Sequence, residues 1–282
     1  MPDESIELRP LNEYESGQVS AIQDWKNAEP GIVGKSLGLI LEPAANLIRK
    51  IIPEGAISGA IEGSAWLSYQ LTDLEDIKRD GEVDDLEELR RKELELSDRL
   101  ADEVHNWAIG LATVEGAGTG AIGIFGAPID VPALVVMALR CIYKIGACYG
   151  YKLDQPEDRD FVLSILSAAS ANSVEEKLVA QAALKNIEIT IAKVTWKKMA
   201  EKAAEKAVSK EGAVIAVKTL SKQLGINLTK RKALSAIPVI GAAVGGSVNG
   251  WYLKEVGWAA RRSFQERWLI ENHKVAFDLG DN

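Results

Sequence analysis

The chain has 282 residues, 47% of them hydrophobic, which is enough to bury a core in one large domain or two modest ones. Its formal net charge of −8 and its isoelectric point near 5.1 argue against nucleic acid as the main partner, because phosphate binding requires a basic surface. The first residues lack the basic and apolar regions of a signal peptide, so we expect a cytoplasmic protein.

Residues 1–30 are polar and mixed, with Trp25 as the only large anchor, and are expected to form a loose lead-in with one short helix. Residues 31–282 are expected to form a single helical domain, because apolar residues recur at helical spacing and period-two alternation never persists. Glycine costs a helix interior roughly 1 kcal/mol relative to alanine, so repeated i, i+4 glycines predict helices whose backbones pack closely, as in lipid. Such glycines are Gly34 and Gly38, then Gly55, Gly59 and Gly63, then Gly116 and Gly120, and finally Gly241, Gly245, Gly246 and Gly250.

The segment 73–104 is acidic and carries leucines spaced roughly as one helix face. It is expected to form a polar surface helix or arm. Together these patterns predict an all-α protein, a compact bundle of Gly/Ala-rich helical hairpins with an acidic helical arm.

The next apolar block runs from Gly116 past Arg140. Asp130 has the features of an N-cap, with Pro132 in the first turn, and predicts a helix to about Ala147 that Gly150 ends. Asp154 before Pro156, with Glu157 three residues on, predicts the start of another helix.

The two cysteines, Cys141 and Cys148, lie in this apolar block. Two helical turns, about 10.5 Å, separate them, which is too far for a disulfide within one straight helix. They are expected to be buried small hydrophobic side chains.

From residue 173 to about 224 the pattern stays helical, with a basic stripe at every fourth residue: Lys198, Lys202, Lys206 and Lys210. More basic residues follow at Lys230, Arg231 and Lys232, and then no charge occurs before Lys254. This last block is long enough to span a bilayer, but its Gly, Ala and Ser content and Pro238 favour a buried or reversibly inserting hairpin.

Two blocks carry a family resemblance. The first is Ala127-Pro128-Ile-Asp130-Val-Pro132 followed by Leu139-Arg140 and Tyr149-Gly150-Tyr151; the second is Leu228-Thr-Lys230-Arg231 followed by Ile237-Pro238-Val-Ile-Gly241 and by Asn249, Trp251 and Tyr252. In order and spacing they resemble the signature of the bacterial EcsC family over residues 55–275, with the first fifty residues outside it. More distantly, they are similar to the membrane-associated apolar helical domain appended to some Era-like GTPases. The EcsC resemblance implies no established activity and offers no catalytic residues.

Candidate chemistry is sparse. His105 and His273 lack metal-ligand spacing, and Gly116–Gly120 lacks the Gly-Lys-Ser/Thr ending of a phosphate loop. Asp102, Glu103 and His105 are explained by an acidic surface helix, since consecutive helical residues point in different directions. We therefore expect no catalytic residue, cofactor or metal.

Three functional interpretations stay open. The first is a non-enzymatic protein that associates with an anionic membrane surface, peripheral to the inner membrane, or binds lipid through its apolar hairpins and basic segment. The second is a scaffold that works with a protein partner, such as a membrane transporter or a defence system, and the third is a hydrolase. Asp130 and Arg140, polar residues in an apolar block, either cap and cover the helix or meet lipid head groups or partners.

Overall fold

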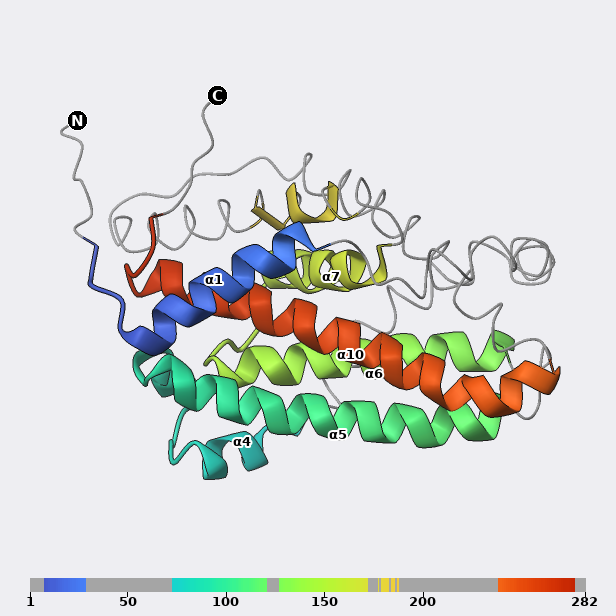
Figure 1. The fold of residues 1–282 in the computed structure, drawn as a ribbon. Helices are drawn as coiled ribbons and strands as arrows, with labels where there is room; N and C mark the ends of the chain where they lie inside the picture. The colour runs from blue at the N-terminus through green and yellow to red at the C-terminus, as the bar shows by residue number, and fades with distance from the viewer. Residues whose placement is uncertain are drawn as a thin grey trace.

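The computed structural model describes residues 8–28, 73–120, 127–171, most of 177–187 and 238–276, with the backbone alone at 112–120, 127–135, 156–157 and 238–249. These ranges contain helices and no strand, which confirms the all-α prediction. The centre is formed by α5 (Leu94–Gly120), α6 (Ala127–Cys148) and α10 (Pro238–Glu271). In Figure 1, α6 and α10 run antiparallel to α5, and α10 packs along much of its length.

Shorter helices surround this centre. On α10 lie α1 (Glu13–Asn27) and α7 (Pro156–Ser170), while α4 (Glu75–Asp80) and the 3₁₀ helix η1 (Leu86–Arg91) flank the start of α5 (Figure 1). The expected polar lead-in therefore contains a helix that packs on the bundle, with Ile22 buried.

Helix starts follow capping chemistry, though not always at the expected residues. In α1, Asn12 and Glu15 form a reciprocal capping box, with hydrogen bonds of 2.7 and 2.9 Å. In α7 the box joins Gln155 to Asp158, so the prediction from Asp154 and Glu157 is one residue early.

Two predictions about prolines and their neighbours are wrong. The helix α6 begins at Ala127, so Asp130 lies inside it and is not its N-cap; Pro128 fits the first turn, where N–H groups have no helical partner. For the same reason Pro238 begins α10 and does not break it. Residues 238–271 form one continuous helix where a hairpin was expected.

The acidic segment is more integrated than an arm. It divides into α4, η1 and the start of α5, and its leucines Leu86, Leu89, Leu94 and Leu100 are buried in the core. Asp76 of α4 also forms a 2.5 Å ion pair with Lys144 of α6. Its acids lie on the outside because the apolar positions of each short helix face inward.

Two glycines that the sequence did not single out mark close helix packing. A Cβ at Gly257 of α10 would lie 2.0 Å from the His105 ring of α5, and one at Gly146 of α6 would lie 2.7 Å from the ring of Phe264. Of the predicted glycines, Gly250 is buried in α10 and the others lie outside the residues whose burial is described, so close backbone packing at these positions stays a prediction.

Gly150 ends α6, as predicted. Its φ of +82° is a left-handed conformation that favours glycine, and an added Cβ would lie 2.7 Å from the backbone nitrogen of Arg90. The Arg90 guanidinium donates a 2.9 Å hydrogen bond to the Gly150 carbonyl, which fixes η1 against the end of α6.

Candidate functional site

A buried carboxylate lies at the junction of four segments. Asp98 of α5 is 2% exposed and accepts hydrogen bonds from the hydroxyls of Tyr14 (2.6 Å) and Tyr149 (2.5 Å). The side-chain amide of Gln265 donates to both Asp98 oxygens at 2.8 Å. Because these donors satisfy the buried carboxylate, the network holds α1, α5, the end of α6 and α10 together.

The two tyrosines of the Tyr149-Gly150-Tyr151 motif point into this interior. Burial raises the pKa of Tyr149 well above its ordinary value, with a further contribution from Asp98. Burial likewise raises the pKa of Tyr151, whose hydroxyl donates to Glu271 at 3.2 Å. Both phenols therefore stay protonated and act as hydrogen-bond donors.

A second polar cluster surrounds Arg267, which is also buried. Its guanidinium donates to Asp158 at 3.1 Å and to Glu271 at 2.9 Å, and its Cζ lies 4.1 Å from the centre of the Tyr151 ring. Paired charges and aromatic stacking offset the cost of burying the cation. The cluster joins the start of α7 to the end of α10.

The sequence predicts that His105 belongs to an acidic surface helix. The structure instead buries it in the core. Its Nε2 lies 3.0 Å from the Lys254 carbonyl oxygen, and its ring meets Trp258 edge-on at 5.7 Å. Burial lowers its pKa. Its neighbour Asp102 forms an ion pair with the nearly buried Arg261.

The contacts of Asp98, Arg267 and His105 join helices to one another and so have a structural role. The cysteines also belong to the core. Cys141 and Cys148 are buried free thiols, as predicted; burial raises the pKa of Cys141 to about 12 and that of Cys148 further. Neither is an activated nucleophile. Among the described residues, no group of three or more His, Cys, Asp or Glu side chains could hold a metal ion.

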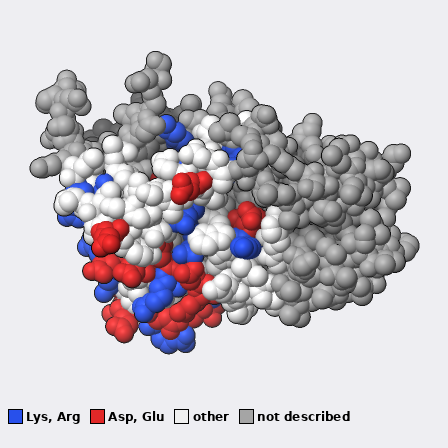
Figure 2. All heavy atoms as spheres, viewed as in Figure 1, with Lys and Arg blue, Asp and Glu red and all other residues white. Residues whose placement is uncertain are grey.

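Charge is distributed unevenly along the bundle. Figure 2 shows acidic side chains with interspersed basic ones at one end, over α4 and the start of α5. The exposed acids of this end include Asp73, Glu75, Asp80, Glu82, Asp84, Asp85, Glu87, Glu88, Glu93 and Glu95.

The opposite end is formed by charge-poor sequence. Figure 1 places the C-terminus of α5 beside the N-termini of α6 and α10. Glu115 is the only charged residue between Glu103 and Gly120, Asp130 is the only one from Ala127 to Leu139, and α10 has none before Lys254. None of the described helices is long and apolar enough to cross a membrane.

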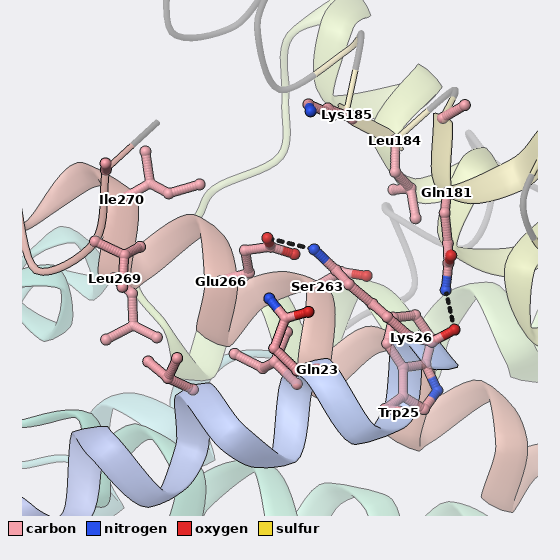
Figure 3. Close-up of a pocket in the computed structure, with 15 residues that line it drawn as sticks. Gln23, Trp25, Lys26, Gln181, Leu184, Lys185, Ser263, Glu266, Leu269 and Ile270 are labelled. Atoms are coloured by element: carbon pink, nitrogen blue, oxygen red, sulfur yellow. Dashed lines mark hydrogen bonds and ion pairs between the residues drawn. The ribbon is translucent and has the colours of Figure 1, made fainter. Parts of the chain in front are cut away.

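A partly open cavity of about 480 Å³ lies between α1, the C-terminal half of α10 and the residues Gln181, Ala182, Leu184 and Lys185 (Figure 3). Its apolar wall includes Val19, Ile22, Leu184, Leu269 and Ile270. Its polar lining includes the 2.5 Å Lys26–Glu266 ion pair and Ser263, whose buried hydroxyl has no hydrogen-bond partner. Its apolar wall distinguishes it from a smaller cavity of about 260 Å³ that is lined by Asp76, Asp80, Glu103 and Lys144 among others.

The structure describes some of the predicted site residues with their side chains, some with the backbone alone and others not at all. Tyr149 and Gly150 lie in the described core, and Arg140 is partly exposed on α6. Pro128 and Asp130 lie in α6, and Pro238 and Gly241 in α10, where the backbone alone is described. The basic candidates Lys198, Lys202, Lys206, Lys210, Lys230, Arg231 and Lys232 lie outside the described residues.

Sequence reasoning missed the residues that organise the interior, above all Asp98, Gln265 and Arg267. A weak signal exists for Asp98, because it shares a helix face with Leu94 and Ala101, both buried. A polar residue at a core position of a helix is a candidate for a buried network. Nothing in the sequence identifies its partners.

The fold and these networks define a helical-bundle protein with a polar, tightly hydrogen-bonded end and a charge-poor end. The model of the EcsC protein family matches residues 7–269, so the chain belongs to this family. The match includes α1, which corrects the expectation that the first fifty residues fall outside the resemblance. Within this match, Tyr14 of α1 donates a hydrogen bond to Asp98 and so joins α1 to the rest of the bundle.

Two curated proteins of Bacillus subtilis (strain 168) are similar to this chain. "Protein EcsC" is 26% identical over 161 residues, 57% of this chain and 59% of that protein. "Uncharacterized protein YdbA" is 31% identical over 96 residues, 34% of this chain and 35% of that protein. The matched segments therefore span about three fifths and about a third of these relatives. No solved structure shows a significant match.

Proposed function

We propose that this protein associates peripherally with a membrane through the charge-poor end of its bundle. The observation that carries the proposal is that three helices become poor in charged residues toward the same end, where only Glu115 of α5 and Asp130 of α6 remain. The His105 contact with the Lys254 carbonyl puts the start of the charge-poor parts of α5 and α10 at one level. Arg140 of α6 lies at a similar level. It precedes Tyr149 by nine residues and is therefore about 13 Å along the helix from the contact between Tyr149 and Asp98, toward the charge-poor end.

The dimensions suit insertion into one leaflet. From Trp107 to Gly120, α5 extends about 20 Å at 1.5 Å per residue, against a hydrocarbon core of about 30 Å for a whole bilayer. Trp107 is 61% exposed and lies where the charged part of α5 gives way to the charge-poor part. Exposed tryptophans are favoured at that depth of a membrane interface.

Vesicle flotation tests the proposal with two matched variants. Trp107→Ala should reduce binding to vesicles of mixed zwitterionic and anionic lipid roughly thirtyfold, corresponding to about 2 kcal/mol of lost burial. Leu8→Ala, which truncates an exposed apolar side chain at the far end of the described chain, should bind as the parent does. If the parent does not float, or both variants bind equally, the charge-poor end is not a membrane contact and the scaffold function becomes the better proposal.

The basic stripe makes a separate prediction about lipid charge. Reversing Lys198, Lys202, Lys206 and Lys210 to glutamate should remove a preference for anionic lipid, since each basic residue near such a surface contributes about 1 kcal/mol. Binding that persists on purely zwitterionic vesicles would then come from the apolar end. A variant that keeps the parent's preference would show that the stripe is a solvated face.

A further inference from the structure

The cavity beneath α1 has the features of a ligand site and is separate from the charge-poor end. Its volume of about 480 Å³ falls within the range of about 300–1,000 Å³ typical of small-molecule pockets. Three separate segments build it, and Figure 3 shows Leu269 and Ile270 of α10 on one side and Leu184 on the other. A mainly apolar wall of this size suits an acyl chain.

One polar group in the wall lacks a partner. Ser263 is 3% exposed, lines the cavity, and its hydroxyl makes no hydrogen bond. An unpaired buried hydroxyl is costly, and a ligand atom that can hydrogen-bond with it would recover that cost. The side chain thus indicates a ligand with a polar group beside its apolar part.

The charged residues of the wall argue for an uncharged head group. Lys26 and Glu266 neutralise each other at 2.5 Å, and Lys185 is itself engaged in an interaction. The amide of Gln181 donates to the Lys26 carbonyl at 3.3 Å. An anionic head group would compete with Glu266 for Lys26, whereas hydroxyls can join Ser263 and the flanking amides without breaking this pair.

We propose that this cavity binds a single-chain amphiphile with an uncharged, hydroxyl-bearing head group, of the monoacylglycerol type. The acyl chain lies against the apolar wall, and the Ser263 hydroxyl, which is buried, turns toward the cavity to hydrogen-bond with the head group. The proposal does not depend on membrane association, because the cavity is built by α1 and the second half of α10.

Calorimetric titration without vesicles tests this proposal. The probes are monodecanoylglycerol, decanoate and decyltrimethylammonium below their micellar concentrations, which share a chain and differ in head-group charge. Monodecanoylglycerol should bind the full-length protein tightest. No binding of it, or tighter binding of either ion, would overturn the proposal.

Three variants locate the ligand. Ser263→Ala should weaken binding roughly fivefold, as expected for one lost hydrogen bond, without lowering the unfolding midpoint. Ser97→Ala removes another unpaired buried hydroxyl that does not line the cavity, and should bind as the parent does. Val19→Trp, which fills the cavity from α1, should abolish binding. Equal affinity in all three variants would place the ligand elsewhere.

The same titration separates the two proposals. Trp107→Ala should retain the parent's affinity for monodecanoylglycerol, because Trp107 does not line this cavity. If Trp107→Ala loses both ligand binding and flotation while Ser263→Ala loses neither, the acyl chain binds at the charge-poor end and the cavity proposal is wrong.

Discussion

Replacing Gly257 with alanine tests a close contact between α5 and α10 in the described core. The new Cβ would lie 2.0 Å from Cδ2 and 2.2 Å from Nε2 of His105, far inside the 3.5–4.0 Å of favourable carbon contacts. The ring cannot yield freely, because it is fixed by its 3.0 Å contact with the Lys254 carbonyl and by the Trp258 ring. Either α10 moves away from α5 or the His105 hydrogen bond breaks.

The magnitude follows from these alternatives. Overpacking costs about 1–3 kcal/mol and the lost hydrogen bond about 1 kcal/mol, while alanine's helix preference returns up to about 1 kcal/mol. Gly257→Ala should therefore lower the free energy of unfolding by about 1–3 kcal/mol in urea titrations followed by circular dichroism. The matched control is Gly110→Ala on α5, where an added Cβ meets nothing within 4 Å; it should stabilise by about 0.5–1 kcal/mol.

A double-mutant cycle makes the test specific. His105→Ala removes the obstructing ring, so Gly257→Ala should cost at least about 1 kcal/mol less in that background than in the parent. Strict additivity, or a Gly257→Ala protein as stable as the parent, would refute the proposed contact.

Three further predictions concern the end of α6. Gly150→Ala should cost at least about 2 kcal/mol in urea unfolding, because φ is +82° and the Arg90 backbone blocks the methyl group; an unchanged midpoint would contradict this. Ellman's reagent at about pH 8 should label neither Cys141 nor Cys148 until denaturant is added, and rapid native labelling would show an open core. Because the pKa of Tyr149 is raised on folding, its stabilising contribution is complete below about pH 10, and above that pH it falls by about 1.4 kcal/mol per pH unit. Tyr149→Phe should have a shallower alkaline slope in pH-dependent unfolding, and an identical slope would exclude this tyrosine as the cause.

The sequence predicted helix ends and helix starts best, because these depend on a few neighbouring residues. Gly150 ends α6 and Pro156 begins α7 as expected, because left-handed φ and a missing N–H act within a few residues. Two of the errors are of the same kind, one residue or one turn at a helix start, whereas the hairpin expected at residues 234–252, the acidic arm and the surface position of His105 were errors about tertiary packing. The Asp130 cap prediction failed because the helix begins at Ala127, three residues before Asp130, with Pro128 rather than Pro132 in its first turn.

The candidate site was less predictable because its polar groups are partners over long separations. Asp98 lies among acids that are solvated, and its donors Tyr14, Tyr149 and Gln265 are 84, 51 and 167 residues away. No window of sequence contains such a pairing. The cavity beneath α1 could not be predicted from the sequence either, because it forms only where α1 packs against a helix more than two hundred residues later in the chain.

The Asp98 network has a consequence for synthesis on the ribosome. Its carboxylate and Tyr149 emerge early, but Gln265, which donates to both oxygens, is made near the C-terminal end. Until then the carboxylate keeps an incomplete set of donors, so closing the core around it is unfavourable. The nascent chain is therefore expected to keep its first helices loosely assembled and to complete the interior only as α10 leaves the exit tunnel.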